Sequence, residues 1–244
     1  MAKILFMVVP CYNEQEVITE TTRRLKEKYE ALIEKGKISP DSKVLYAKDN
    51  TWEMIRDIHN NDKMFRGLCL SRNRGHQNAV LAGLMQAKEE ADMVISMDAD
   101  LQDDIDAIDA MVDKYNEGYD VVYGVRNKRE TDTFFKRFTA QAYYKLLLKL
   151  GVDIVYNHAD FRLMSKRVLD NLENYKEVNL FLRGMFPLVG FKSTSVYYER
   201  NERIAGESHY PLKKMLALAF DGITSLSIKP IRMITSFGFI VALV

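Results

Sequence analysis

The chain has 244 residues, of which 47% are hydrophobic and 28% are charged, and its formal net charge is +1. This composition excludes a disordered or fibrous protein, and the length allows one α/β domain with an appendage. The charge is unevenly divided, because residues 1–125 carry a net −7 and residues 126–244 a net +8. A cation site is therefore expected in the first half, and an anion-binding or membrane-facing surface in the second.

Apolar strands and amphipathic helices alternate regularly through residue 125. The expected strands are 3–10, 43–47, 67–71, 92–98 and 119–124, and the helices between them are 15–34, about 51–59, 77–88 and 104–116. This order predicts a mostly parallel α/β sheet with helices on both faces. Cys11 and Cys69 fall in or beside these strands, where we expect small buried side chains in a reducing compartment rather than a disulfide framework.

Ligands of such sheets bind outside the carboxyl ends of the strands. Residues 10–14, residues 98–102 and Arg126 all follow expected strands, so they are predicted to converge on one crevice. Asp98 and Asp100 are two residues apart, and on an extended chain their side chains point the same way. Two such carboxylates repel each other unless a cation such as Mg²⁺ or Mn²⁺ lies between them. The alternative is a solvated acidic helix start.

Past Arg126 the order of elements changes. We expect a helix at 134–150, a loop leading into a strand at 157–164, helices at 168–174 and 181–189, an exposed strand at 192–200 and a loop at 203–209. Pro211 begins an amphipathic helix that either packs against the domain or lies in a membrane interface.

An apolar run of 12 uncharged residues follows Arg232. A full membrane span needs about 20 apolar residues, so this run is either a short buried helix or the beginning of a truncated transmembrane helix. We favour the second interpretation, because the run has no polar stop and because Lys229 and Arg232 suit a cytoplasmic membrane edge.

Eight short motifs occur in the order Val9–Glu14, Leu70–Gln77, Ser96–Asp103, Tyr123–Arg126, Ala159–Met164, Phe181–Gly184, Ala205–Pro211 and Asp221–Ser225. In this order the chain resembles the family 2 glycosyltransferases of GT-A fold. The resemblance is strongest to the polyprenyl-phosphate branch, which includes dolichyl-phosphate mannose synthase-like and bactoprenol glucosyltransferase-like proteins. The motifs extend over nearly the whole chain and are specific together, although each alone is weak.

The resemblance implies a metal site and a donor site. Asp98, Asp100 and Gln102 would hold Mg²⁺ or Mn²⁺ on the diphosphate of a UDP-sugar. His76 is expected to be a structural residue of the turn that contains it.

Pro10, Tyr12 and Glu14 would border the base and ribose of the donor, although core packing is the alternative for Tyr12. The family also has an Asp-Asp-Gly-Ser segment after the second strand, which is missing between Val44 and Trp52. Asp49 is the remaining candidate for its nucleotide contact.

The resemblance also implies contacts to the acceptor. Asp160 matches the proposed catalytic base position, where it acts as a base or orients the acceptor or a sugar hydroxyl; a capping residue in a loop is the alternative. Arg126, Arg200, Arg203 and Ser208 would bind phosphates, for which a guanidinium is well shaped. For Arg200 a solvated surface position is equally compatible with the sequence.

Together these features predict a metal-dependent, inverting glycosyltransferase that moves a sugar from a UDP-sugar to undecaprenyl phosphate on the cytoplasmic membrane face. A transferase with a soluble glycan acceptor is one alternative, and a degenerate nucleotide-binding subunit is another, because of the missing segment. The predicted organisation is a catalytic domain at 1–210, an interface helix at 211–229 and the start of a transmembrane helix at 230–244. A homo-oligomer is compatible with the sequence, and no nucleic acid partner is expected.

Overall fold

The computed structural model describes residues 2–11, 14–48, 52–127, 158–176, 180–201 and 229–243. In chain order its elements are β1 (Leu5–Cys11), α1 (Ile18–Glu34), β2 (Lys43–Lys48), α2 (Trp52–Asn61), β3 (Phe65–Cys69), α3 (His76–Ala87), β4 (Met93–Ser96), α4 (Ala107–Asn116), β5 (Val121–Arg126), β6 (His158–Ser165), α6 (Lys166–Leu172), α7 (Leu182–Val189), β7 (Ser193–Tyr198) and α9 (Lys229–Leu243).

The chain divides into two compact units. The first comprises Met1–Lys128, Asn157–Tyr175 and Phe191–Glu207, and the second comprises Arg129–Tyr156, Lys176–Gly190 and Ser208–Val244. All seven described strands belong to the first unit, whereas α7 and α9 belong to the second. The predicted boundaries at 210 and 229 stay a prediction.

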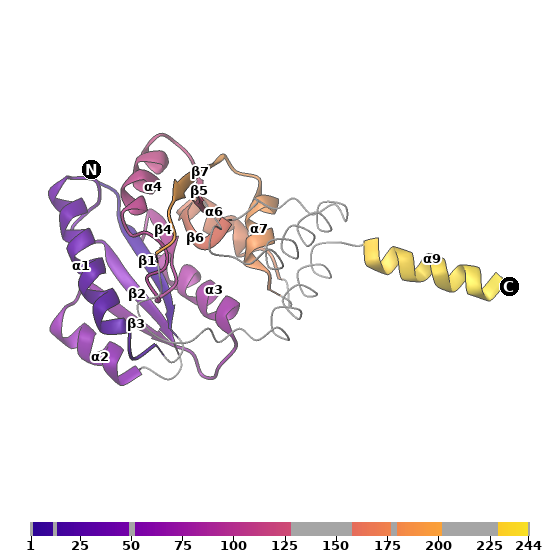
Figure 1. The fold of residues 1–244 in the computed structure, drawn as a ribbon, viewed down its shortest axis with the longest axis horizontal. Helices are drawn as coiled ribbons and strands as arrows, with labels where there is room; N and C mark the ends of the chain where they lie inside the picture. The colour runs from indigo at the N-terminus through magenta and orange to yellow at the C-terminus, as the bar shows by residue number, and fades with distance from the viewer. Residues whose placement is uncertain are drawn as a thin grey trace. The chain divides into compact units, whose positions relative to one another are not determined.

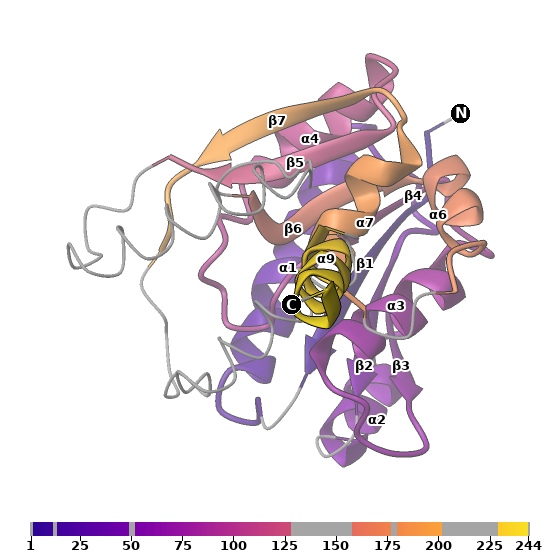
Figure 2. The ribbon, with the colours of Figure 1, turned by 90° about the vertical axis from the view of Figure 1, so that its right-hand side faces the viewer.

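The seven strands form one sheet with the order β3-β2-β1-β4-β6-β5-β7 (Figure 2). β1 pairs in parallel with β2 and β4, β2 pairs in parallel with β3, and β5 pairs in parallel with β7. β6 is antiparallel to both of its neighbours, β4 and β5. The expected mostly parallel α/β sheet is confirmed, with one reversed strand inserted between β4 and β5.

β1 lies near the middle of the sheet and is buried at every position, because helices cover both faces. Successive side chains of a strand point to opposite faces. Leu5, Met7 and Val9 accordingly belong to the core cluster that α1 and α4 cover. On the other face Val8 meets α3, where a methyl group on Gly83 would overlap the Val8 side chain.

Helices cover the two faces of this sheet in separate layers. α1, α2 and α4 lie on one side, and α3 and α6 lie on the other (Figure 1). On the first side Lys28 of α1 lies 2.9 Å from Asp109 of α4, which joins the two helices. On the second side the buried Lys88, just after α3, lies 3.0 Å from Asp170 of α6 and 2.8 Å from Glu173.

The strands of the sheet begin and end on two opposite sides, which we call edges and name by strand direction. These edges differ from an edge strand, which is an outermost strand of the sheet. At the carboxyl edge β1, β4 and β5 end, and the reversed strand β6 begins there. At the opposite amino edge these three strands begin and β6 ends. The reversal of β6 brings Asp160, near its start, to the edge that Asp98 and Arg126 follow. The sequence predicted a loop leading into a strand at 157–164, but strand directions are not visible in a local pattern.

Several sequence expectations differ from the structure. Cys69 is exposed rather than buried, because β3 is an edge strand with one partner; Cys11 is buried as expected. β4 ends at Ser96, so Asp98 and Asp100 follow the strand instead of extending it. The predicted helix at 134–150, the loop at 203–209 and the helix starting at Pro211 lie outside the described residues.

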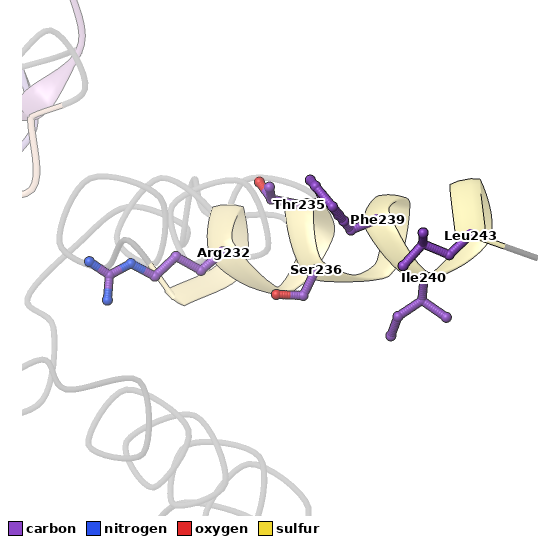
Figure 3. Close-up of a pocket in the computed structure, with 6 residues that line it drawn as sticks. All are labelled: Arg232, Thr235, Ser236, Phe239, Ile240 and Leu243. Atoms are coloured by element: carbon purple, nitrogen blue, oxygen red, sulfur yellow. The ribbon is translucent and has the colours of Figure 1, made fainter.

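The second unit contributes two described helices. α7 buries Leu182, Met185 and Phe186, and α9 exposes a series of large apolar side chains. Figure 3 shows six side chains of α9, those of Arg232, Thr235, Ser236, Phe239, Ile240 and Leu243. In the described part of the chain no helix has both the length and the apolar character needed to cross a membrane.

Candidate active site at the carboxyl edge

The two aspartates after β4 lie in a tight turn rather than on an extended segment. The carboxylate Oδ1 of Asp100 accepts a hydrogen bond from the backbone N–H of Gln102 at 3.2 Å. Leu101 has φ 55°, a left-handed conformation that is rare for a leucine. The buried hydroxyl of Thr21 in α1 donates to the carbonyl oxygen of Ala99 at 2.8 Å. This hydrogen bond therefore joins α1 to the turn that contains Asp98 and Asp100.

Among the described residues, no arginine or lysine forms an ion pair with the carboxylate of Asp98. Its side chain is 35% exposed. Desolvation by the surrounding protein raises its pKa to about 6, the nearby imidazole of His76 opposes that rise, and the negative charges of Asp160, Asp103 and Asp100 add to it. Its one ion-pair partner among the described residues is His76, with Oδ1 3.7 Å from Nε2. A carboxylate in such a position gains stability when a cation is bound.

Asp160 is held from three directions. Its Oδ1 accepts a hydrogen bond from Nη2 of Arg162 at 2.6 Å, and its backbone carbonyl accepts one from the Ser96 hydroxyl at 2.5 Å. Its Oδ2 lies 3.8 Å from Nε2 of His76. His76 therefore lies between the carboxylates of Asp98 and Asp160, at the first residue of α3.

A second arginine and carboxylate pair lies beside this group. Oδ1 of the buried Asp103 accepts hydrogen bonds from Arg126 Nη2 at 2.8 Å and from the Tyr198 hydroxyl at 2.5 Å. The sequence predicted that Arg126 binds phosphate. In the structure Asp103, Arg126 and Tyr198 join the segment after β4 to the ends of β5 and β7, and the Arg126 side chain stays 25% exposed.

Gly124 lies where the pairing of β5 with β6 changes register. Tyr123 pairs with Arg162 and Val125 with His158, so the extra residues lie on β6, the strand that carries Asp160. Such bulges often re-aim side chains near active sites. A methyl group on Gly124 would lie 2.8 Å from the backbone oxygen of Phe161. Only glycine fits this close approach of β5 to the irregular segment of β6.

Gln102 and Arg200 contact each other directly. Nη2 of Arg200 donates to Oε1 of Gln102 at 2.5 Å, and the N–H of Asn201 donates to the backbone oxygen of Gln102 at 2.9 Å. The predicted metal ligand Gln102 and the predicted phosphate ligand Arg200 thus belong to one cluster. This contact is compatible with both predicted roles, because the amide oxygen of Gln102 has two acceptor positions and can bind a cation while it accepts from Arg200.

The two ends of the predicted donor site are described in part. Pro10 is buried in β1 and pairs with Ala47 of β2. The carbonyl of Glu14 accepts hydrogen bonds from the N–H groups of Val17 and Ile18, which starts the turn into α1. Tyr12, Asp49, Arg203 and Ser208 lie outside the described residues, so their predicted roles stay predictions.

Comparison with known proteins decides the family. A profile described as Glycosyl transferase family 2 matches residues 6–173, the stretch from β1 to the end of α6. The chain belongs to glycosyl transferase family 2. The resemblance stated from the motifs is therefore confirmed, and the protein is a transferase.

Similar proteins include other family 2 glycosyltransferases. The uncharacterized glycosyltransferase YkoT of Bacillus subtilis (strain 168) is 55% identical over 241 residues, which cover 97% of this chain and 72% of the relative. The prophage bactoprenol glucosyl transferase homolog of Escherichia coli (strain K12) is 38% identical over 240 residues, which cover 97% of this chain and 76% of the relative.

Solved structures match the fold of this family 2 glycosyltransferase. Mannosyl-3-phosphoglycerate synthase from Rubrobacter xylanophilus has a TM-score of 0.61 at 13% identity, covering 97% of this chain and 75% of its own. Glucosyl-3-phosphoglycerate synthase from Mycobacterium tuberculosis, in complex with Mn²⁺, UDP-glucose and phosphoglyceric acid, has a TM-score of 0.57 at 15% identity, covering 92% and 78%. The fold is GT-A, as the motifs implied.

The side-chain oxygen atoms at this site are of the kinds that bind divalent cations. Asp98 and Asp100 supply carboxylate oxygens and Gln102 an amide oxygen, which are the ligand types that Mg²⁺ and Mn²⁺ prefer. Within the described ranges, no three His, Cys, Asp or Glu side chains form a complete metal cluster. A site of two carboxylates is the arrangement expected when substrate phosphates and water supply further ligands.

Four residues of the site were not recognised from the sequence. His76 was interpreted as structural, and Arg162, Thr21 and Tyr198 were assigned no role. For Arg162 a signal was present, since a charged residue within the apolar run Phe161–Met164 is expected to be buried beside a partner. For Thr21 and Tyr198 no local signal distinguishes them from ordinary helix and strand residues.

Proposed function

We propose that this glycosyltransferase transfers a sugar from a UDP-sugar to undecaprenyl phosphate, or to another polyprenyl phosphate, with inversion at the anomeric carbon. The observation that carries the proposal is the contrast among the site's carboxylates. Asp103 and Asp160 are each paired with an arginine, whereas Asp98 faces three other carboxylates and has the imidazole of His76 as its one ion-pair partner among the described residues. That arrangement supports a cation on a donor diphosphate.

Asp98, Asp100 and Gln102 would hold Mg²⁺ or Mn²⁺. A divalent cation bound there would neutralise the charge that develops on the departing diphosphate. The Mn²⁺ and UDP-glucose in the related M. tuberculosis structure support both the ion class and the donor class. Arg200, which contacts Gln102, is exposed and can reach a phosphate from the same cluster.

The rest of the donor would extend toward the end of β1. Pro10 and Glu14 lie beside the first helix there, and Tyr12 and Asp49 would complete the contacts to the base and ribose. Thr21 ties this helix to the turn between Asp98 and Asp100. Donor recognition and diphosphate binding would therefore share one rigid support.

The acceptor is supported by the bactoprenol glucosyl transferase relatives. A phosphate oxygen of the polyprenyl phosphate would attack the anomeric carbon in line with the departing diphosphate. Because that phosphate is already an anion at neutral pH, it needs no base to remove a proton. Arg126, Arg203 and Ser208 would hold the acceptor or donor phosphates by charge-assisted hydrogen bonds.

The acceptor also implies a membrane surface. The exposed apolar side chains of α9 and the net +8 of residues 126–244 are compatible with contact to an anionic cytoplasmic leaflet. The interface helix at 211–229, the transmembrane continuation after 230 and any homo-oligomer belong to this proposal as predictions.

The test is turnover by the purified chain in detergent or nanodiscs. UDP-glucose, UDP-N-acetylglucosamine and UDP-galactose are offered with undecaprenyl phosphate and Mn²⁺, and the glycolipid is measured by mass spectrometry. We expect one donor to give undecaprenyl-phosphate sugar, and undecaprenol, which lacks the phosphate, to give none. Turnover with a soluble glycan instead would replace the acceptor. Binding of UDP without any turnover would favour a nucleotide-binding subunit.

A further inference from the structure

The buried guanidinium of Arg162 is an unusual feature of the sheet. Its side chain is 2% exposed, on β6 between Phe161 and Leu163, which are fully buried. In the sheet it lies opposite Ser96 of β4 and Tyr123 of β5. Stability alone does not require a charge here, because a well-packed apolar residue of similar volume is often as stable as a buried ion pair.

The partner of this guanidinium is a residue of the active site. Asp160 is two positions earlier on the same strand, and the two side chains contact each other directly. Nη2 of Arg162 is 2.6 Å from Oδ1 of Asp160, and the Ser96 hydroxyl holds the backbone of Asp160 at 2.5 Å. These contacts fix the carboxylate in one orientation, while 12% of its side chain stays accessible.

This orientation restricts what Asp160 can bind. A carboxylate beside an arginine is an acceptor of hydrogen bonds and donates none. It would repel the anionic acceptor phosphate, whereas a sugar hydroxyl would donate to it. Its Oδ2 lies near His76, which also contacts Asp98, the predicted ligand of the donor's cation. Oδ2 of Asp160 therefore lies on the side of the site where His76 and Asp98 are found.

We propose that Arg162 is a positioning residue, which orients Asp160 to accept a hydrogen bond from a hydroxyl of the transferred sugar. The inference rests on the proposed UDP-sugar donor and deepens it. It assigns Asp160 to the sugar rather than to proton removal from the acceptor. Arg162 itself contacts no substrate and acts through Asp160.

The sugar contact can be isolated by comparing UDP-sugar with UDP. Calorimetry with Mn²⁺ would measure both affinities for wild-type protein, Arg162→Gln, Arg162→Lys, Asp160→Asn and the double variant Arg162→Gln/Asp160→Asn. The three UDP-sugars named above serve as probes. One hydrogen bond to a charged group corresponds to about a ten- to hundredfold change, so the preference for UDP-sugar over UDP should fall by that factor in Arg162→Gln and Asp160→Asn. The affinity for UDP should not change.

The double variant tests whether Arg162 acts through Asp160. If it does, the double variant loses no more preference than Asp160→Asn alone, because the two changes are not additive. Arg162→Lys should lie between wild type and Arg162→Gln, since it keeps the charge but loses the planar fork. In the double variant both charges are gone, so no buried charge is left without a partner. If Arg162→Gln alone does not fold, the double variant is compared with Asp160→Asn instead.

A matched control exists at the amino edge. Arg167 also pairs with an aspartate, Asp120, at 2.8 Å, and Arg167→Gln should leave both affinities unchanged. Equal losses for UDP and UDP-sugar, an unchanged preference, or additive effects in the double variant would overturn the role of Arg162. A wild-type protein that binds UDP but no UDP-sugar better than UDP would overturn the inference as well. Absence of UDP binding would instead overturn the proposed donor and, with it, this inference.

Discussion

The two edges of the sheet use the same kinds of charged residue in opposite ways. At the amino edge the charges are compensated locally: Asp120 accepts from the Ser165 hydroxyl at 2.9 Å and from Arg167 at 2.8 Å, and Lys88 lies between Asp170 and Glu173. At the carboxyl edge Asp98 faces other carboxylates and its pKa rises to about 6. Ion pairs that are complete fasten elements together, whereas an incomplete set of charges is suited to binding a cation.

The largest effect is expected from removing a carboxylate at the carboxyl edge. Asp98→Asn or Asp100→Asn should lower kcat by about a hundredfold or more, because the proposed cation would lose one of its two charged ligands. The melting temperature without metal should not fall for Asp98→Asn, since one of several repelling charges is gone. Kinetics with Mn²⁺ and thermal unfolding check both statements. Full activity in both variants would contradict the metal assignment.

The ion pair between Asp103 and Arg126 should contribute to both stability and activity. Asp103→Asn leaves the guanidinium of Arg126 without its charged partner, so we expect a loss of about 2 to 3 kcal/mol in unfolding free energy together with a lower kcat. Tyr198→Phe removes only a neutral donor and should cost about 1 kcal/mol. Urea unfolding separates the two variants. Equal losses would show that the charge of Asp103 contributes little.

The pH dependence of metal binding should sharpen the contrast. A carboxylate whose pKa is raised holds its proton until the pH passes about 6, and a metal can bind it only after that proton leaves. Mn²⁺ affinity should therefore fall by up to about tenfold for each pH unit below 6 and stay level above it. Calorimetry between pH 5 and 8 measures this slope. Asp98→Asn is the control, and a slope that persists in it would assign the proton to another group.

The smallest effect is expected at the amino edge. Hydrogen bonding to Glu173 raises the pKa of the buried Lys88, but Asp170 and Glu173 are about half exposed and can be rehydrated when Lys88 is removed. Lys88→Met should thus cost about 1 kcal/mol, or about 2 to 4 °C in melting temperature, with kcat unchanged. A lower kcat at unchanged stability would mean that the two edges are not separate in function.

The sequence predicted the fold well where one segment determines its own environment. The continuous apolar run at β1 indicated a strand buried on both faces, and the turn after β4 was correctly placed at the carboxyl edge. The direction of β6 could not be predicted, because alternation reads the same in parallel and antiparallel strands. The prediction that Cys69 is buried was wrong for a related reason, since a short apolar run does not show whether its strand is an edge strand.

Candidate site residues could be predicted from the sequence where they lie within a recognisable motif. Asp98, Asp100 and Asp160 were proposed from their motifs, and their roles stay predictions; the structure places Asp98 and Asp160 on either side of His76. The pairing of Asp103 with Arg126 joins the segment after β4 to β5, and that of Thr21 with Ala99 joins α1 to the turn between Asp98 and Asp100. Such pairings depend on tertiary packing, so neither partner's local sequence reveals them.

The insertion of β6 between β4 and β5 has a consequence for how the protein is made. During synthesis the ribosome releases β4 and β5 before β6, because β6 begins at His158 and β5 ends at Arg126. Until then β4 and β5 each lack the neighbour that joins them in the finished sheet. Such late, non-local pairing slows folding and leaves strand edges open in the meantime. The nascent glycosyltransferase should therefore depend most on chaperones while residues between β5 and β6 are being added.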